Sequence, residues 1–556
     1  MEVRSCNLKP WHKLKMDDHP HTTEDHSISR FNERNRDFSP TSHIASRMIV
    51  SGVHKEAFCF EHGIVVCDAL VLFPVLAMRK DRTTIPWKIA CAALLLCVAA
   101  AIPSPAQTYT TLFSFDVTDG SQPYSSLVQG LDGNLYGTTL YGGPQSHDNG
   151  TVYKITPSGV LATLEVFSCI GNSNCPNGEF PYAGLALATD GSLYGTAMAG
   201  GAHNRGAVFK ISSSGTFTLV HSFVYGRQEC CPYGGLVQVA NGDLYGTNAG
   251  EALGGTIFKI TPRSNYSWVY CFCSGTDGAA PYAAMVQGTD ANLYGTTVNG
   301  GANGDGTVFK MTPSGTLTAL YSFCSQTNCT DGANPYAGLV QGSDGNFYGT
   351  TANLGGGTHS GTVFKITPAG ALTTLHAFCS QTNCTDGANP YADLIQAIDG
   401  NFYGTTLGGG TYNRGTVFKI TPSGTLTTLH SFCSQTNCTD GANPYAGLVQ
   451  ATDGSFYGAT SSYGAGVGTV FRFSVGLGPF VESLPTSGNV GAAIKILGTK
   501  LTGTTAVSFN GIAATFTVVS GTEIMTTVPS GATTGFVTVT TPSGKLKSNK
   551  KFRVTP

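Results

Sequence analysis

In this 556-residue chain, paired cysteines are the residues whose type and spacing most clearly suggest a chemical role. Three loops read CSQTNC, and a fourth loop places its two cysteines one residue further apart. The pairs are Cys169/Cys175, Cys324/Cys329, Cys379/Cys384 and Cys433/Cys438. Each loop offers two thiols, whereas a closed zinc site needs four ligands. We therefore predict local disulfides in an oxidising compartment, with zinc as the alternative.

Four further cysteines, Cys230, Cys231, Cys271 and Cys273, depart from this loop pattern. Cys273 has lost its loop partner, so pairing with Cys230 or Cys231 of the neighbouring unit is one hypothesis. The spacing alone does not decide how these four pair.

Catalytic and cofactor motifs give no signal. The sequence holds no GxSxG, HExxH, Walker loop, dinucleotide fingerprint or EF-hand loop. The Asp-Gly-Ala-Asn-Pro runs from Asp331, Asp386 and Asp440 could ligate calcium, but an Asx turn before proline also explains them. We predict no catalytic residue, no metal ligand and no cofactor.

Other polar residues recur once in each unit of a long repeat. One cation occupies the same point of every unit: Lys154, Lys210, Lys259, Lys310, Lys365, Lys419 and Arg472. A ring of cations could bind an anionic polymer, but side chains that reach the rim explain the repetition more simply. The non-repeated residues His147, Asp148, His203, Arg205, Asp305, His359 and Arg414 lie in variable loops, where binding specificity usually resides.

The repeat that positions these residues is marked by Tyr-Gly, at Tyr136, Tyr194, Tyr245, Tyr294, Tyr348, Tyr403 and Tyr457. The clearest unit runs PYAGLVQG from Pro335, NFYGTT from Asn346, GTVFKITP from Gly361 and ALTTLHAF from Ala371. Short segments rich in Val, Phe, Tyr and Thr between Gly, Asp and Pro indicate strands joined by turns. Each unit therefore predicts a four-stranded antiparallel meander.

The two ends of the array complement each other. The last unit stops after GTVFRF at Phe473, without a fourth strand, and an extra fourth-type strand, YTTLFSF, runs from Tyr109 to Phe115. If this strand completes the last unit, a ring closes and no edge stays open. We predict an all-β chain with a seven-bladed β-propeller over residues 107–475, closed by the N-terminal strand.

The repeat unit DGNLYGTT…GTVFKITPSGTLTTLHSF…PYAGLVQG resembles the GloVer (Gloeobacter and Verrucomicrobia) tandem repeat of bacterial exported proteins. The resemblance extends from Tyr109 to Phe473. It implies export, repeats and a variable C-terminal module, and it implies no reaction.

A different β-pattern fills residues 479–556, with Pro485–Gly488, Ile494–Gly498, Val507–Gly511 and Gly535–Val539 as its main segments. Their spacing predicts a small sandwich. The segment resembles the IPT/TIG immunoglobulin-like domain, which implies a spacer or binding module of cell-surface and extracellular proteins.

The first 106 residues have another composition, with two of the 72 glycines. From Met78 the chain is typical of a secretory signal peptide: Arg79, Lys80 and Arg82 precede an apolar stretch, and small residues lead to Ala106. We predict a signal peptide over 78–106, cleavage between Ala106 and Gln107, and a gene-model extension or disordered leader over 1–77. A signal anchor with a cytoplasmic tail is the alternative.

Composition limits the function classes. Charged residues make up 12% of the chain and the net charge is −2, so nucleic acid is not an expected partner. We expect an exported monomer without a membrane span after signal removal, located in the periplasm, at the cell surface or outside the cell. Its expected role is non-enzymatic binding of a polysaccharide or protein, or surface organisation. The alternative is an extracellular propeller lyase or hydrolase acting on polysaccharide or peptide.

Overall fold

The computed structural model describes residues 107–145, 148–169, 175–224, 230–250, 254–354, 360–464 and 466–555. These residues form β-strands and turns and contain no α-helix. The predicted leader, signal peptide and Ala106 lie outside them, as do His147 and His359.

Seven four-stranded antiparallel sheets occupy residues 108–474, numbered here sheets 1 to 7 in chain order. Sheets 1 to 3 contain β2 (Val128–Gln129), β3 (Leu135–Thr139), β4 (Asp148–Ile155), β5 (Leu161–Ser168); β6 (Ala186–Leu187), β7 (Leu193–Ala197), β8 (Ala207–Ile211), β9 (Phe217–Ser222); and β10 (Val237–Gln238), β11 (Leu244–Asn248), β12 (Thr256–Ile260), β13 (Tyr266–Cys271). Sheets 4 to 6 contain β14 (Val286–Gln287), β15 (Leu293–Thr297), β16 (Thr307–Met311), β17 (Leu317–Ser322); β18 (Val340–Gln341), β19 (Phe347–Thr351), β20 (Thr362–Ile366), β21 (Leu372–Ala377); and β22 (Ile395–Gln396), β23 (Phe402–Thr406), β24 (Thr416–Ile420), β25 (Leu426–Ser431).

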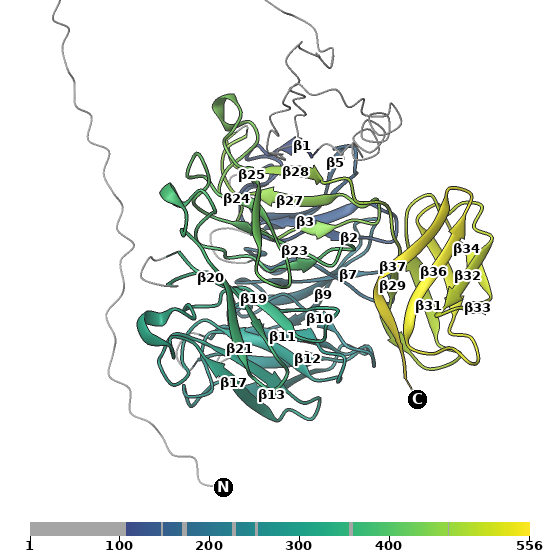
Figure 1. The fold of residues 1–556 in the computed structure, drawn as a ribbon, viewed down its shortest axis with the longest axis horizontal. Helices are drawn as coiled ribbons and strands as arrows, with labels where there is room; N and C mark the ends of the chain where they lie inside the picture. The colour runs from purple at the N-terminus through teal and green to yellow at the C-terminus, as the bar shows by residue number, and fades with distance from the viewer. Residues whose placement is uncertain are drawn as a thin grey trace, which may run out of the picture. The chain divides into compact units, whose positions relative to one another are not determined.

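Sheet 7 combines the two ends of the repeat. It contains β26 (Val449–Gln450), β27 (Phe456–Thr460), β28 (Thr469–Ser474) and, as its outer strand, β1 (Thr108–Ser114). β1 pairs antiparallel with β28, from Thr108 opposite Ser474 to Ser114 opposite Thr469, and the two strands lie side by side in Figure 1. The expected all-β propeller class is confirmed, and the N-terminal strand completes the last sheet as predicted.

The first strand of each unit is shorter than the sequence suggests. Of the segment PYAGLVQG, only Val340 and Gln341 pair with the next strand. Pro335 has no N–H to donate, and the residues after it make contacts between sheets instead of ladder bonds. The Pro-Tyr part of each unit is therefore free for another role.

The cores lie between neighbouring sheets. In one cluster Tyr348, Val363 and Phe378 of sheet 5 pack against Leu394 and Phe418 of sheet 6. Both faces of a sheet are thus covered, which explains the continuous apolar runs within the strands. Glutamines at the ends of the first strands add hydrogen bonds between sheets, such as Gln341 Oε1, which accepts from Thr289 N.

Two further sheets form the C-terminal sandwich. One has the order β29 (Glu482–Leu484), β31 (Ala493–Leu497), β35 (Glu523–Thr527), β34 (Phe516–Val518); the other has the order β30 (Ser487–Gly488), β37 (Gly544–Val554), β36 (Gly535–Thr541), β32 (Ala506–Phe509), β33 (Ile512–Ala514). Ile496, Val507, Phe509 and Phe552 belong to one buried core between them. The predicted immunoglobulin-like sandwich is confirmed.

Candidate functional site

Seven tyrosines form a closed ring of aromatic contacts. Each follows a proline at the start of a unit, and each contacts the tyrosine of the next sheet. The successive pairs are Tyr124/Tyr182, Tyr182/Tyr233, Tyr233/Tyr282, Tyr282/Tyr336, Tyr336/Tyr391, Tyr391/Tyr445 and Tyr445/Tyr124, with ring centroids 4.7 to 5.8 Å apart. Because the last tyrosine contacts the first, the sheets meet around a common centre.

Hydrogen bonds between sheets fix the segments that carry these tyrosines. Thr296, in the YGTT motif of sheet 4, donates to the Ala337 carbonyl of sheet 5 at 2.7 Å. The Asn334 side chain donates back to the Val298 carbonyl at 3.0 Å. Equivalent bonds recur in other sheets, so every tyrosine is held between two neighbouring units.

The tyrosine ring lines a cavity of about 290 Å³. Most of the remaining lining is small or apolar, with alanines, glycines, Leu127 and Val128, and it also includes Ser125, Ser126 and Asp393. A partly apolar cavity with few polar groups is typical of a small-ligand site. We call this cavity with its seven tyrosines the tyrosine channel.

One charged residue, Asp393, lines the tyrosine channel among the described residues. Its carboxylate oxygen Oδ1 accepts a hydrogen bond from the backbone N–H of Gly338. Asp393 is surrounded by protein, yet its side chain has exposed surface because it faces the channel. Burial raises the pKa of Asp393, and the bond from Gly338 opposes that rise.

The tyrosines of the channel are neutral hydroxyl groups. Burial raises the pKa of Tyr445 to about 12, and the hydroxyl of Tyr182 lowers that of Tyr445 by a smaller amount. Burial also raises the pKa of Tyr124, Tyr233 and Tyr391. The ring therefore offers aromatic faces and hydroxyls, with no phenolate near neutral pH.

The variable loops also carry exposed aromatic residues, one of which lies close to the ring. Tyr141, Tyr412 and Tyr463, which are 43%, 50% and 39% exposed, belong to the loops between the second and third strands of sheets 1, 6 and 7. Tyr141 is close enough to Tyr124 to add to the rise of its pKa. Arg414 lies over the Tyr463 ring at 5.1 Å, so one of the predicted variable-loop residues contacts an exposed aromatic side chain.

The predicted cysteine pairs lie in the loops that precede the tyrosines. The sulfur atoms of Cys169/Cys175, Cys324/Cys329, Cys379/Cys384 and Cys433/Cys438 lie at disulfide distance. In the last three pairs the second cysteine ends a short 3-10 turn, η1 (Thr327–Cys329), η2 (Thr382–Cys384) or η3 (Thr436–Cys438). These turns let the loop fold back on itself.

The hypothesis that Cys273 pairs across units is wrong. Cys273 pairs with Cys271, and Cys230 pairs with Cys231. Cys271 ends strand β13, and the chain turns directly after it, which brings Cys273 within 5.2 Å between Cα atoms. A partner two residues away thus replaces the one expected in the neighbouring unit.

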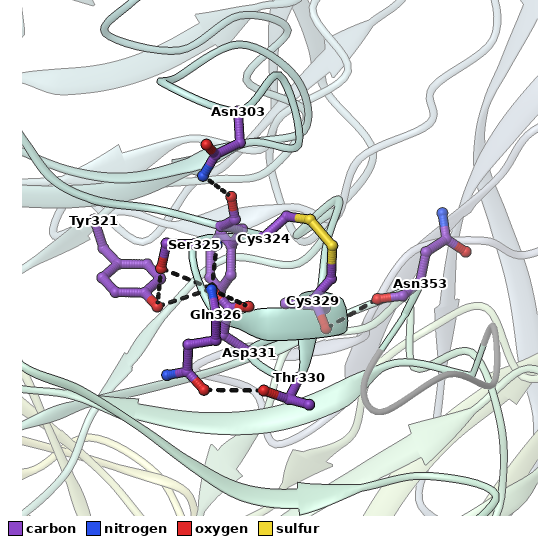
Figure 2. Close-up of a disulfide and its surroundings, with 11 residues drawn as sticks. Asn303, Tyr321, Cys324, Ser325, Gln326, Cys329, Thr330, Asp331 and Asn353 are labelled. Atoms are coloured by element: carbon purple, nitrogen blue, oxygen red, sulfur yellow. Dashed lines mark hydrogen bonds between the residues drawn. A yellow bond between two sulfur atoms is a disulfide. The ribbon is translucent and has the colours of Figure 1, made fainter.

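The buried aspartates of the CSQTNC loops have a structural role. Figure 2 shows Asp331, which is 0% exposed, at the centre of one loop. It accepts hydrogen bonds from Ser325 N, Ser325 Oγ and Tyr321 Oη at 2.9, 3.1 and 2.8 Å. All three donors bond Oδ2, and Oδ1 accepts from Gln326 N at 3.3 Å, so hydrogen bonds within the loop account for the buried carboxylate.

Four of the repeated cations, Lys210, Lys259, Lys310 and Arg472, pair with an aspartate of their own sheet, whereas Lys154 donates to the Ser213 carbonyl of the next sheet. Lys210 contacts Asp190 at 2.8 Å, Lys310 contacts Asp290 at 3.3 Å, and Arg472 contacts Asp453 at 3.4 Å. Each aspartate lies in the turn between the first and second strands. These cations are therefore partly neutralised by carboxylates of the turns.

The tyrosine channel is the feature that sequence reasoning missed. The repeated Pro-Tyr before each first strand was a signal for it, because a large polar aromatic residue recurs where the strand does not need one. Asp393 was signalled by the single change from PYAG to PYAD.

A ring of four-stranded sheets around a channel, followed by an immunoglobulin-like sandwich, defines a β-propeller protein with a C-terminal accessory domain. The family model described as the Gloeobacter/Verrucomicrobia repeat matches residues 101–289, 232–384 and 379–496, and the IPT/TIG domain model matches residues 479–554. The chain belongs to the Gloeobacter/Verrucomicrobia repeat family and ends in an IPT/TIG domain.

Three solved structures show low similarity to this chain. A luciferin-regenerating enzyme is 9% identical, with 67% of this chain and 98% of that chain covered and a TM-score of 0.35. A protein of unknown function from Bacteroides thetaiotaomicron is 15% identical, with 66% and 98% covered and a TM-score of 0.33. A puromycin hydrolase is 11% identical, with 58% and 48% covered and a TM-score of 0.33. The comparison with curated proteins finds no match. No helix among the described residues has the length and apolar character needed to cross a membrane.

Proposed function

We propose that this chain is an exported, non-enzymatic binding protein whose propeller binds a polysaccharide in and above the tyrosine channel. In this proposal the IPT/TIG domain is a spacer or adhesive unit, and the mature protein begins at Gln107. The closed ring of seven tyrosines around a cavity of about 290 Å³ is the observation that carries the proposal.

The chemistry of the ring supports a carbohydrate. A tyrosine presents a flat apolar face together with a hydroxyl group, and a sugar ring has the same combination of apolar and polar surface. The exposed Tyr141, Tyr412 and Tyr463 provide further aromatic surface on neighbouring sheets, so that more than one sugar unit can be held.

The lining of the channel favours binding over hydrolysis. Glycoside hydrolysis uses two carboxyl groups on opposite sides of the scissile bond. In the described part of the chain the channel has one carboxylate, Asp393, and the tyrosines are neutral. This donor set can orient a ligand but lacks the acid and base pair.

The test measures both binding and cleavage. The protein from Gln107 to Pro556 is incubated with soluble and insoluble polysaccharides, and retention and released fragments are measured by co-sedimentation and mass spectrometry. We expect retention without fragments above a heat-inactivated control. Tyr282→Ala should weaken retention about tenfold, or about 1.4 kcal/mol, because it opens the ring between Tyr233 and Tyr336.

The matched control is Trp268→Ala, which removes an exposed aromatic residue from β13, the outer strand of sheet 3, outside the channel lining. Equal loss in both variants would contradict the channel as the site. Fragments from the intact protein would overturn the non-enzymatic assignment and favour the lyase or hydrolase alternative. Absence of retention on every polysaccharide would overturn the carbohydrate assignment.

A further inference from the structure

One position in the tyrosine channel differs in charge from its six equivalents. Two residues after each ring tyrosine the chain places a small residue, and in sheet 6 it places an aspartate instead. The seven equivalents are Ser126, Gly184, Gly235, Ala284, Gly338, Asp393 and Gly447. The fold therefore tolerates glycine or alanine here, and Asp393 is not needed to build a sheet.

The Asp393 carboxylate is only half satisfied. Oδ1 accepts from Gly338 N, while Oδ2 has no hydrogen-bond partner among the described residues. The equivalent Ser126 shows what the scaffold needs, because its hydroxyl accepts from Gly447 N at 2.9 Å and carries no charge. The Asp393 side chain is exposed to the channel, so its free oxygen Oδ2 is accessible to a bound molecule.

No lysine, arginine or histidine lines the channel within the described ranges. A cationic ligand in the channel would therefore meet a carboxylate that no protein cation neutralises. The neighbours of Asp393 are aromatic: Tyr391 lies two residues before it and contacts Tyr336 at 5.0 Å and Tyr445 at 4.9 Å between ring centroids. Aromatic faces attract organic cations within about 6 Å of a ring centroid.

We propose that Asp393 and the tyrosine ring bind the ammonium group of an organic cation, and that the preferred polysaccharide is one that carries free amino groups. The proposal rests on the proposed carbohydrate-binding function and names the substrate class. The ammonium group donates to Oδ2 of Asp393, and the faces of the neighbouring tyrosines surround its remaining sides.

A metal ion fits this donor set less well. Calcium takes about six to eight oxygen ligands, and several of them are usually carboxylates. The described lining offers one carboxylate, with neutral tyrosine hydroxyls around it. An organic ammonium needs one carboxylate and aromatic surface, which is what the channel supplies.

The experiment compares two oligosaccharides that share a sugar backbone and differ at the amino group. Glucosamine oligomers carry protonated amines, whereas N-acetylglucosamine oligomers carry neutral acetamide groups. The ratio of their dissociation constants, compared between the wild type and Asp393→Asn, separates the effect of the charge from that of the acetyl group. Titration calorimetry uses the protein from Gln107 to Pro556, with tetramethylammonium chloride as a small cationic probe and calcium chloride as the metal probe. We expect the amino oligomer to bind at least about tenfold tighter than the neutral one.

Asp393→Asn should abolish this preference while the affinity for the neutral oligomer changes less than about twofold, because the amide keeps the shape and loses the charge. Asp399→Asn is the matched control, since it removes the same charge from the turn of the same sheet, outside the channel lining. Thermal unfolding of each variant checks that the propeller is intact. In the double variant Asp393→Ala/Ala284→Asp the carboxylate moves to an equivalent position, and the preference should return.

Equal affinity for the two oligomers in the wild-type protein would overturn the ammonium assignment and leave the proposed carbohydrate binding in place. Absence of binding to either oligomer and to tetramethylammonium would overturn both. A preference that survives Asp393→Asn would overturn the role of Asp393. Calcium binding that requires Asp393 and competes with tetramethylammonium would overturn the organic cation in favour of a metal.

Discussion

Three consecutive sheets place a proton donor against a buried aspartate, and the donor changes from tyrosine to histidine. Tyr321 donates to Asp331 in sheet 4, and His376 and His430 contact Asp386 and Asp440 at 3.0 and 3.1 Å in sheets 5 and 6. The scaffold therefore accepts either side chain at this position. The choice matters because histidine titrates near neutral pH and tyrosine does not.

We expect His430→Tyr to make the protein more resistant to mild acid. Burial lowers the pKa of His430, and the Asp440 carboxylate only partly opposes this. In the unfolded chain His430 binds a proton below about pH 6.5. In the folded chain it binds the proton only at a lower pH. The unfolded state thus binds more protons, and the contribution of His430 to the free energy of unfolding falls as pH decreases.

Urea unfolding of the wild type and His430→Tyr between pH 7.5 and 5 measures this effect, because other titrating groups are common to both proteins. The difference in unfolding free energy should shift in favour of the variant as pH falls. A difference that stays constant over this range would contradict the assignment of a depressed pKa.

The channel shows where sequence reasoning ends at the residue scale. Cys324 and Cys329 lie five residues apart, so their pairing follows from local geometry. Tyr336 and Tyr391 contact each other only because two sheets meet at the channel. The recurrence of Pro-Tyr is visible in the sequence, but the cavity it surrounds depends on how closely the sheets approach.

At the scale of the element, Asp331 organises a disulfide loop whose backbone has few other partners. Its carboxylate accepts from the backbone N–H of Ser325 and of Gln326 as well as from side chains. Replacing Asp331 with alanine removes the acceptor of these part-buried hydrogen bonds and the partner of Tyr321. We expect Asp331→Ala to lower the free energy of unfolding by about 3 kcal/mol, measured by guanidinium unfolding with the disulfides intact.

The control for this prediction is Thr330→Ala in the same loop. Thr330 is exposed and donates only to the Gln326 side chain at 3.1 Å, so its loss should change stability by less than about 0.5 kcal/mol. If the two variants are equally stable, the buried carboxylate is not the group that stabilises the loop.

Elements were predictable to different degrees. The turn at Asp344-Gly345 was evident because Gly345 adopts a φ of +83°, which glycine accepts most easily. The length of the first strand was not evident from the sequence, because β18 has a ladder partner on one side only. The chain directly before it runs along the channel and does not pair in a ladder. Local turn chemistry is encoded in adjacent residues, whereas the end of a strand near the centre depends on neighbouring sheets.

For the whole molecule, three kinds of contact join the last unit to the first. β1 pairs with β28, the Gln129 side chain accepts from Thr452 N at 2.9 Å, and Tyr445 contacts Tyr124 at 4.7 Å. Counting strand types predicted the first contact, because one fourth strand was missing at one end and spare at the other. The hydrogen bond to Gln129 and the contact between Tyr445 and Tyr124 follow from ring closure and add interactions between the last sheet and the first.

Closure makes a definite prediction for a protein that lacks residues 107–115. Without β1 the outer edge of β28 is unpaired, and Phe115, which is fully buried in the core shared by sheets 7 and 1, is lost. Loss of one buried phenylalanine alone costs about 3 to 5 kcal/mol, and an exposed strand edge promotes association. We therefore expect a lower unfolding temperature by calorimetry and higher oligomers by light scattering.

A synthetic peptide with the sequence of residues 108–115 should reverse both effects, because it supplies the missing strand to the open edge. The same peptide with Phe115→Ala is the control: it retains the backbone ladder and loses the buried ring, so its rescue should be weaker. A truncated protein that unfolds at the wild-type temperature and stays monomeric would show that β1 does not hold the ring closed. Rescue by the peptide would instead show that the closed ring depends on β1, which lies about 360 residues before its partner β28 in the sequence. Ligand binding in the channel would then depend on the same strand.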